Sequence, residues 1–294
     1  MQILSPAGFS DYELIDCGDF EKLERFGKYI TIRPEPQAVW KRNMSVAEWE
    51  KRAHVRFVPR SSSSGEWKKL KQMPDQWEIS YPLKSGPAKA ELKFRLGLTS
   101  FKHVGIFPEQ AVNWQKIHRF FAEKEKSRFL NLFAYTGGAS LAARAAGCEV
   151  THVDSIKQVV TWANDNMQRS GLDNIRWLVD DALKFVKKEM RRGNKYQGII
   201  LDPPAYGHGP AGEKWKLEDN IGEMMESVLN LLDPEVHLFI LNAYSLGFSA
   251  LVPKNLLSPY AARNGSELEI GELCLPFTSG MQLPLGVFGS LSKQ

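Results

Sequence analysis

The stretch Arg128-Phe129-Leu130-Asn131-Leu132-Phe133-Ala134-Tyr135-Thr136-Gly137-Gly138-Ala139-Ser140 decides the fold. It is a short apolar run followed by a glycine pair, and a helix-forming segment from Leu141 to Ala146 comes next. A strand, a glycine turn and a helix in this order place backbone N–H groups at the mouth of a parallel sheet. Such a mouth binds a nucleotide-like ligand, so this turn is the candidate ligand site.

Strand and helix patterns alternate from Arg128 onward. The expected strands lie at about 128–133, 149–153, 175–179, 196–201 and 237–243, and the expected helices at about 138–146, 156–170, 182–192 and 221–232. A weaker helix near 251–263 precedes two last strands, at about 267–275 and 283–291. Alternation with short connections gives right-handed crossovers and helices on both faces of the sheet. The predicted fold is therefore α/β and Rossmann-like, with a seven-stranded, mostly parallel sheet.

The first 100 residues differ from the rest in their pattern of expected secondary structure. Strand patterns lie at 12–17, 29–33 and 91–96, and a strand pair is expected from 67–71 and 77–81. Ser61 to Gly65 resembles a flexible loop. We predict a small β-rich domain over residues 1–100 and the ligand-binding domain over 101–294, which opens with a helix from Pro108 to about Lys126.

Basic and aromatic residues are frequent in the N-terminal part. They either face RNA or, for most of the tryptophans, fill the core of a small sheet. The set comprises Arg33, Trp40, Lys41, Arg42, Trp67, Lys68, Lys69 and Lys71.

Composition excludes several classes of protein. The formal net charge of +4 permits a polyanionic partner without demanding one. No apolar run approaches the ~18 residues of a membrane span, and the first residues lack the pattern of a signal peptide. Cys17, Cys148 and Cys274 are far apart and show no metal-ligand spacing. We therefore expect a cytoplasmic protein with reduced cysteines and neither a metal site nor a membrane partner.

Two acidic positions follow predicted strands near the glycine turn. In a nucleotide-binding fold, Asp154 accepts hydrogen bonds from ribose hydroxyls, and Asp181 accepts from an adenine amino group. The alternative is a cap for the helix that follows each of them; Ser155 can provide the cap beside Asp154.

The most specific local signal is Asp202-Pro203-Pro204-Ala205-Tyr206, which follows a buried apolar strand. Two prolines can neither continue a strand nor comfortably begin a helix, so they form a stiff turn. That turn projects the Asp202 side chain and the Pro203 carbonyl into the cleft.

Absent motifs narrow the reaction class. The glycine turn at 137–138 is not part of a G-x-G-x-x-G, and the sequence has no Walker A motif and no G-x-S-x-G elbow. These absences argue against a nicotinamide dehydrogenase, a nucleotide triphosphatase and a serine hydrolase.

The chain resembles the class I S-adenosylmethionine-dependent methyltransferases, and more closely the bacterial branch of large-subunit rRNA methyltransferases. The resemblance covers about residues 100–245. It rests on the segments Gly105 to Gln110, Leu130 to Gly138, His152 to Ser155, Trp162 to Asn166 and Asp202 to Tyr206.

The resemblance implies S-adenosylmethionine as the cofactor and RNA as the substrate. The methionine part of the cofactor would lie on the turn formed by Phe133, Ala134, Tyr135, Thr136, Gly137 and Gly138. Asp154 and Ser155 would bind the ribose, Asp181 and Ala182 the adenine, and Gln110 lies in the matching segment before the cofactor fold. Asp202 borders the site of methyl transfer.

Two departures bear on the mechanism: the absence of a suitably placed cysteine, and Ala205, which separates Pro204 from the aromatic Tyr206. No cysteine is placed to attack a pyrimidine ring, because Tyr244 and Ser245 occupy the region where related enzymes carry it.

We therefore expect methylation of a base nitrogen, with Asp202 and the Pro203 carbonyl accepting from the amine, Tyr206 stacking on the base and Tyr244 shaping the pocket. The alternatives are a small-molecule or protein methyltransferase, and a non-catalytic RNA-binding protein with a vestigial cofactor fold.

Overall fold

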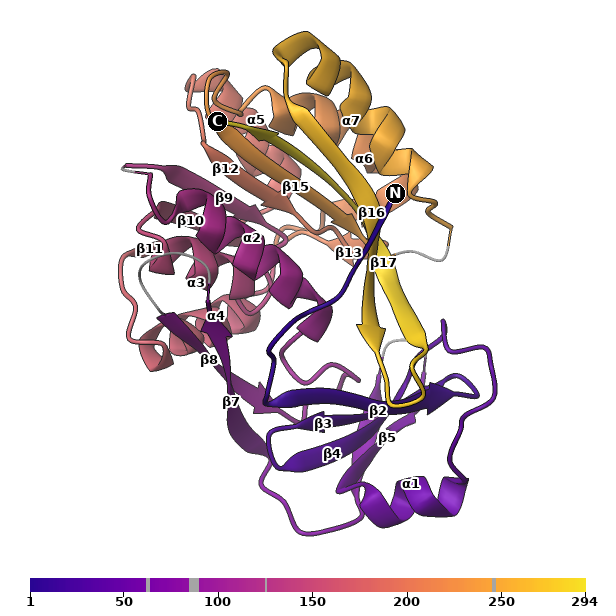
Figure 1. Ribbon diagram of the computed structural model, residues 1–294. Helices are drawn as coiled ribbons and strands as arrows, with labels where there is room; N and C mark the ends of the chain where they lie inside the picture. Colours follow the sequence, from indigo (N-terminus) through magenta and orange to yellow (C-terminus); the bar gives the residue numbers. More distant parts are fainter. Residues whose placement is uncertain (62–63, 85–89, 125, 245–246) are drawn as a thin grey trace.

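The computed structural model describes residues 1–61, 64–84, 90–124, 126–244 and 247–294. A large sheet with helices forms one part of the molecule, and the β-rich N-terminal segment lies below it in Figure 1.

The large sheet has the strand order β1-β16-β17-β15-β12-β9-β10-β11. Five consecutive strands, from β15 to the edge strand β11, are parallel, and β17 runs antiparallel to both of its neighbours. The bounds are β1 (Gln2–Leu4), β9 (Arg128–Leu132), β10 (Glu149–Asp154), β11 (Ile175–Val179), β12 (Gly198–Leu201), β15 (His237–Ala243), β16 (Glu267–Pro276) and β17 (Gln282–Lys293). The predicted Rossmann-like sheet is thus confirmed. An eighth strand, β1, joins its edge beside β16; its three residues carry too little pattern to be predicted.

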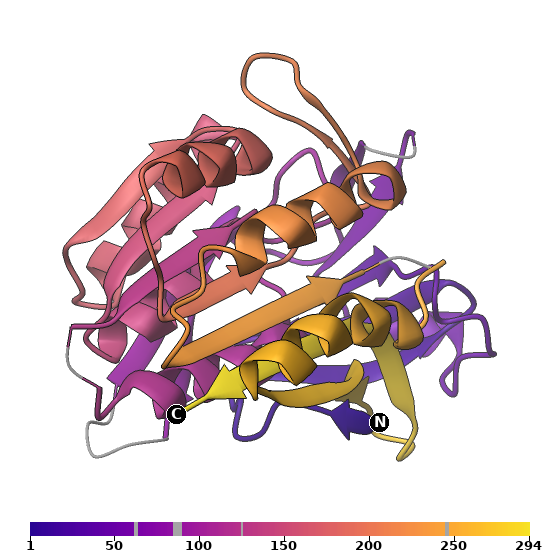
Figure 2. The same cartoon turned by 90° about the horizontal axis from the view of Figure 1, so that it is seen from above.

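Helices cover both faces of this sheet, as predicted (Figure 2). Alternate residues of β9 explain why, since Phe129 packs in one buried cluster with Trp114 and Leu141, whereas Leu130 and Leu132 pack in another. The helices are α2 (Ala111–Phe121), α3 (Gly138–Ala145), α4 (Lys157–Arg169), α5 (Ala182–Arg191), α6 (Leu217–Leu229) and α7 (Leu251–Asn264). The 3-10 turn η1 (Pro108–Gln110) precedes α2, which ends five residues before the predicted Lys126.

The N-terminal part contains a five-stranded sheet in the order β2-β3-β4-β5-β6 and a separate hairpin of β7 and β8. The bounds are β2 (Tyr12–Gly18), β3 (Glu21–Phe26), β4 (Tyr29–Pro34), α1 (Val46–Arg52), β5 (Val55–Pro59), β6 (Gly65–Lys69), β7 (Gln76–Leu83) and β8 (Ala90–Gly97). The predicted pairing of 67–71 with 77–81 is wrong, because β6 pairs with β5 and β7 pairs with β8. The turn around Pro74 connects two sheets instead of closing a hairpin. Residues 62–63 of the predicted serine loop lie outside the described ranges.

The aromatic residues of the N-terminal part belong mainly to its core, as preferred from the sequence. Trp40 stacks on Phe277, and Trp67 packs edge-on against Phe57. Two arginines of the predicted RNA-facing set are also engaged internally, since Arg33 pairs with buried Glu24 and Arg42 pairs with Asp19 and Glu21. The exposed members of that set are Lys41, Lys68, Lys69 and Lys71.

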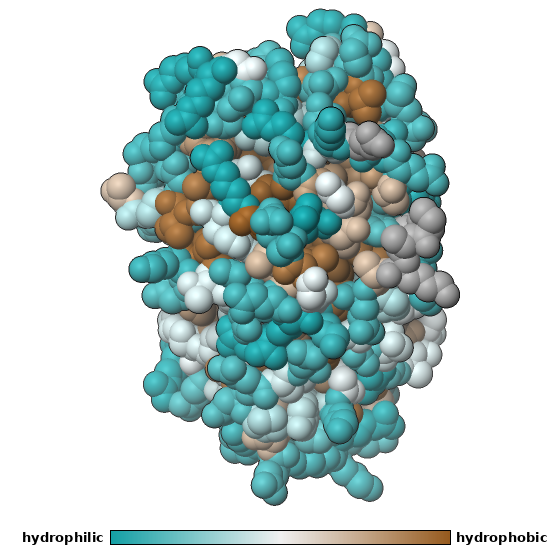
Figure 3. Space-filling model, turned by 90° about the vertical axis from the view of Figure 1, so that its left-hand side faces the viewer, coloured by the Kyte–Doolittle hydropathy of each residue, from teal (hydrophilic) through white to brown (hydrophobic). Residues whose placement is uncertain are grey.

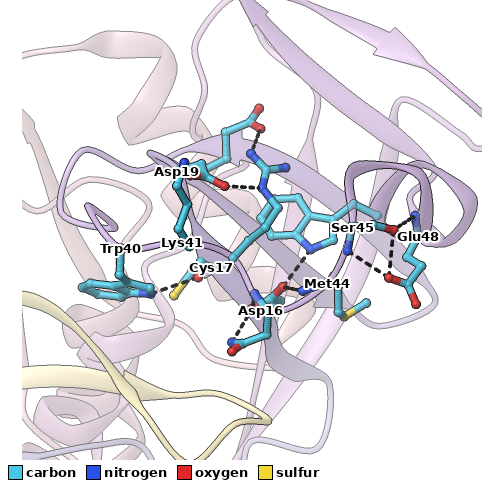
Figure 4. Close-up of polar contacts among 12 residues, drawn as sticks. Asp16, Cys17, Asp19, Trp40, Lys41, Met44, Ser45 and Glu48 are labelled. Atoms are coloured by element: carbon cyan, nitrogen blue, oxygen red, sulfur yellow. Dashed lines mark hydrogen bonds and ion pairs between the residues drawn. The ribbon is translucent and has the colours of Figure 1, made fainter.

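The segment between β4 and α1 is fastened to the sheet by Asp16 (Figure 4). Its carboxylate accepts hydrogen bonds from the Asn43 side chain, the Met44 backbone N–H and the indole of Trp49, at 2.9–3.0 Å. Ser45 and Glu48 then form a capping box that begins α1. A single buried carboxylate therefore fixes the start of the helix.

The two parts of the chain contact each other directly. The turn between β16 and β17 reaches the N-terminal sheet, where Thr278 Oγ1 donates to the Ile15 carbonyl at 2.9 Å (Figure 1).

On the face shown in Figure 3, hydrophobic side chains gather at mid-height, with mainly hydrophilic surface above and below. The predicted division near residue 100 stays a prediction. Among the described residues, no helix has the length and apolar character to cross a membrane.

Candidate functional site

A cleft opens at the carboxyl ends of β9 and β12. One wall is the turn after β9, and the other comes from the segment around η1. Its lining is formed by Ile106, Phe107, Gln110, Trp114, Asn131, Phe133, Ala134, Tyr135, Thr136, Gly137, Gly138, Ala139, Ile200 and Asp202. The structure therefore brings together the whole predicted 133–138 turn, Gln110 and Asp202.

The turn after β9 has an unusual backbone. Phe133 and Tyr135 are non-glycine residues at φ values of 55° and 49°, and Gly137 lies at 91°. Such left-handed residues are costly and cluster at ligand sites. Gly138 starts α3 against the ring of Trp114, and a Cβ at this position would lie 2.5 Å from that ring. The glycine pair thus allows a sharp turn and a close approach of helix to ring.

Two neighbouring elements hold this turn. Thr136 Oγ1 donates to the Gly105 carbonyl at 2.7 Å, and Asn166 Nδ2 of α4 donates to the Thr136 carbonyl at 3.0 Å. Asn166 also accepts from the Arg95 backbone N–H at 2.8 Å. A Cβ on Gly105 would meet the Trp162 ring at 2.3 Å. The segments from Gly105 and from Trp162 therefore support the cleft wall.

Asp154 ends β10 beside this turn. Its carboxylate accepts from the Tyr135 N–H at 2.9 Å and from the Ile156 N–H at 3.0 Å. Burial raises the pKa of Asp154. The side chain of Ile156 is 51% exposed, although it is large and apolar. Ile156 lies two residues after the acidic end of the strand, with Ser155 between them, and was not singled out from the sequence.

Asp181 caps α5. Its Oδ1 accepts from the Lys184 backbone N–H at 2.8 Å, which is the alternative role that the sequence left open. Ala182 is buried at the start of the same helix. Neither residue lies in the lining of the cleft. Their contact with an adenine stays a prediction.

Asp202 follows β12 and lines the cleft. Burial raises the pKa of its carboxyl to about 7. Pro203 is buried, and the Pro204 carbonyl accepts from the Trp215 indole at 2.7 Å. The proline pair is thus anchored through the Pro204 carbonyl, which is consistent with the stiff turn expected there.

Tyr206 lies outside the lining of the cleft, and its stacking on a base stays a prediction. It begins the hairpin of β13 (Tyr206–His208) and β14 (Lys214–Lys216) and is 59% exposed. Its hydroxyl is 3.1 Å from His208 Nε2. This hairpin was not predicted, because its strands have three residues each. Tyr244 donates instead to Glu35 of the N-terminal part, at 2.8 Å.

Three amides form a buried network at the cleft. Gln110 Oε1 accepts from Asn113 at 2.8 Å and from Asn242 at 3.2 Å, and Asn113 also donates to Asn242 Oδ1. Gln110 is thereby held at the cleft wall. Sequence reasoning missed Asn113 and Asn242, although a polar residue near the end of the apolar strand β15 was the available signal.

The cysteines lie away from this chemistry. Cys17, Cys148 and Cys274 are buried and unpaired, and none of them lines the cleft. Burial raises the pKa of Cys17 and of Cys148 to about 12, which suppresses the nucleophilic thiolate. In the described ranges, no group of three or more potential metal ligands occurs.

A family model for S-adenosylmethionine-dependent methyltransferases matches residues 23–263. The chain belongs to this family. S-adenosylmethionine is the family's cofactor, and the left-handed turn with its glycine pair fits a ligand that approaches backbone N–H groups closely.

The chain is similar to curated proteins of known name, including two methyltransferases. The chain is 31% identical to the ribosomal RNA large subunit methyltransferase K/L of Shewanella frigidimarina over 155 residues, which is 51% of the chain and 21% of that protein. It is 30% identical to the ribosomal RNA large subunit methyltransferase I of Klebsiella pneumoniae over 118 residues, which is 39% of the chain and 29% of that protein. The matches thus span less than a third of each relative.

Solved structures agree with this placement. The S-adenosylmethionine-dependent methyltransferase of Agrobacterium tumefaciens has a TM-score of 0.91 and 34% identity, with 100% of this chain and 94% of that chain covered. The SMU.776 protein in complex with SAH shares the fold, with a TM-score of 0.73 and 17% identity over 97% of this chain and 76% of that chain.

Proposed function

We propose that the protein transfers a methyl group from S-adenosylmethionine to a base nitrogen of RNA, with ribosomal RNA as the first candidate, and without a covalent cysteine intermediate. The observation that carries this proposal is the desolvated Asp202 carboxyl, which lines the cleft beside the glycine turn of a methyltransferase fold.

The cofactor would lie along the carboxyl ends of β9, β10 and β11. Backbone N–H groups of the 133–138 turn would bind its methionine part, and Asp154 and Ser155 its ribose. Asp181, Ala182 and the exposed side chain of Ile156 would border the adenine. When bound, the cofactor supplies a methyl group activated by a sulfonium centre.

Asp202 would act on the acceptor. Its carboxylate and the Pro203 carbonyl would accept hydrogen bonds from the target amine and orient the nitrogen toward the methyl group. The same carboxylate would take the proton that the nitrogen loses on methylation. Tyr206, on its exposed hairpin, would contact the substrate outside the cleft rather than form its wall.

RNA is favoured as the substrate by two observations. The curated relatives are named as ribosomal RNA methyltransferases. The N-terminal part exposes the cations Lys51, Arg52, Lys68 and Lys71 around α1 and β6, where a phosphate backbone would be attracted. The cytoplasmic location and the two-domain division remain predictions.

The test is to incubate the protein with isotope-labelled S-adenosylmethionine and unmodified ribosomal RNA, and to identify the labelled nucleoside by mass spectrometry. A label on a base nitrogen supports the proposal. A C5-methylated pyrimidine contradicts the nitrogen acceptor, and label found only on a small molecule or on protein contradicts RNA as the substrate.

A further inference from the structure

The hairpin of β13 and β14 follows the Asp202-Pro203-Pro204 turn directly. It stands out from the rest of the molecule as the orange loop at the top of Figure 2, and Tyr206 on β13 is 59% exposed. Trp215 on β14 differs from its neighbours, because only 5% of it is exposed. A large aromatic residue buried within a mostly exposed hairpin marks the point where the hairpin is attached to the fold.

Trp215 contacts the acceptor side of the cleft through its indole. The Nε1–H donates to the Pro204 carbonyl at 2.7 Å, and the Leu217 N–H donates to the Ala205 carbonyl at 3.0 Å. Both bonds fix the segment 202–205, the acceptor loop, whose Asp202 lines the cleft. Two consecutive peptide units after the acidic residue are therefore held by the end of the hairpin.

The ring of Trp215 contacts the cofactor side of the cleft. Its centroid is 4.8 Å from that of the Phe133 ring, at an interplanar angle of 54°. Phe133 lines the cleft at a φ of 55°, which a bulky residue adopts only where its surroundings hold it. Trp215 belongs to those surroundings and packs against the start of the 133–138 turn.

Methyl transfer requires the two sides of the cleft to be held at a fixed separation. The acceptor nitrogen forms a bond to the methyl carbon while the electron pair of the breaking C–S bond goes to sulfur, and the nitrogen then loses a proton to Asp202. A small displacement of either side costs rate. Trp215 contacts one side through its N–H and the other through its ring, and it lies outside the cleft lining. A single rigid side chain therefore joins the two sides from behind.

Resting on the proposed function, we propose that Trp215 is a positioning residue for methyl transfer, whose indole N–H fixes the acceptor loop at Pro204 and whose ring supports the cofactor turn at Phe133. The two contacts have different consequences. Loss of the N–H should lower the transfer rate at saturating ligands, whereas loss of the ring contact should lower the affinity for the cofactor.

Two substitutions separate these contacts. Trp215→Phe keeps a benzene ring for Phe133 and removes the N–H, whereas Trp215→His keeps a five-membered ring with an N–H and removes the benzene part. Trp40→Phe is the matched control, because the Trp40 indole donates to the Cys17 carbonyl at 3.0 Å in the N-terminal part. Circular dichroism verifies the fold of each protein, and calorimetry gives the fraction that binds S-adenosylmethionine.

Single-turnover transfer to unmodified ribosomal RNA is measured at pH 8 with both ligands saturating, and each rate is divided by the cofactor-binding fraction. Trp215→Phe should transfer about tenfold more slowly, within the range of one lost hydrogen bond, while its affinities for cofactor and RNA stay within about twofold. Trp215→His should keep the rate within about threefold and bind the cofactor roughly two- to tenfold more weakly, as loss of one aromatic pair predicts. Trp40→Phe should match wild type in rate and affinity.

The outcomes separate the two proposals. RNA that wild type leaves unlabelled overturns both. A Trp215→Phe protein that transfers at the wild-type rate overturns the positioning role and leaves the proposed function standing. The same holds if both Trp215 variants lose rate and cofactor affinity together, because that pattern reflects lost core packing alone. Equal slowing of Trp40→Phe also overturns the role of Trp215.

Discussion

At the scale of single residues, the shape and the charge of the cleft depend on individual positions. Gly138 contacts the Trp114 ring so closely that an added Cβ would lie 2.5 Å from it, and Asp202 titrates near neutral pH because burial raises its pKa. The two residues set the shape and the charge of the site, respectively.

Gly138→Ala should destabilise the fold and weaken cofactor binding. The new Cβ must displace a buried ring, which costs about 1–3 kcal/mol as other overpacking does. Chemical denaturation and calorimetry with S-adenosylmethionine measure the two effects. Gly222→Ala is the control, since nothing lies within 4 Å of its added Cβ in α6; an equal effect of both variants would show that the contact with Trp114 is unimportant.

Methyl transfer should accelerate as the pH rises through about 7. The raised pKa keeps Asp202 protonated below that value, and a protonated carboxyl cannot take the proton of the amine. Single-turnover rates between pH 6 and pH 8 should rise about tenfold in wild type, as one titrating group with this pKa predicts. Asp202→Asn should be slow and lack the rise. A flat wild-type profile would exclude Asp202 as the proton acceptor.

At the scale of elements, continuous apolar runs predicted the parallel strands, which are buried on both faces, and helical periodicity predicted the helices between them. These patterns missed β1, β13 and β14, which have three residues each, and also β3, α1 and β5 of the N-terminal part. They also paired β6 with β7, since the pattern within a strand does not identify its neighbour.

The residues of the candidate site also fall into those that the sequence predicts and those that it does not. The turn after β9, Gln110 and Asp202 were predictable because the local motif fixes their place, and all line the cleft. The position of Tyr206 was not, since a hairpin carries it away from the cleft lining. The amides Asn113 and Asn242 meet only when α2 and β15 pack together.

Asn166→Ala should loosen the cleft wall from a distance. The side chain joins α4 to the Thr136 carbonyl and to the Arg95 N–H, so its removal leaves one buried and one partly buried backbone group unsatisfied. We expect about 2 kcal/mol less stability and weaker S-adenosylmethionine binding. Thermal melting with and without cofactor measures both. Asn164→Ala on the same helix is the control, and indistinguishable melting curves would disprove the supporting role.

At the scale of the whole molecule, we propose that the N-terminal sheet and the methyltransferase fold present one substrate surface. Tyr244 at the end of β15 bonds to Glu35 after β4, and α1 and β6 carry exposed cations. Substrate length should therefore matter for affinity.

Replacing Lys51, Arg52, Lys68 and Lys71 by alanine should weaken RNA binding and reduce its dependence on salt. For each phosphate that the protein no longer neutralises, the slope of log affinity against log salt becomes shallower by roughly 0.7–0.9. Fluorescence anisotropy across a salt series measures the slope, and cofactor affinity serves as the control. An unchanged slope would place the RNA on another face.

The most direct test of the central claim is a single-turnover methyl-transfer assay on unmodified ribosomal RNA, with wild type and Asp202→Ala compared at saturating S-adenosylmethionine. Calorimetry first establishes that both proteins bind the cofactor. We predict that wild type labels the RNA and that Asp202→Ala binds the cofactor but transfers at least a hundredfold more slowly, in line with roughly 10²-fold or more for a positioned acid–base group. Equal rates for the two proteins would contradict the account.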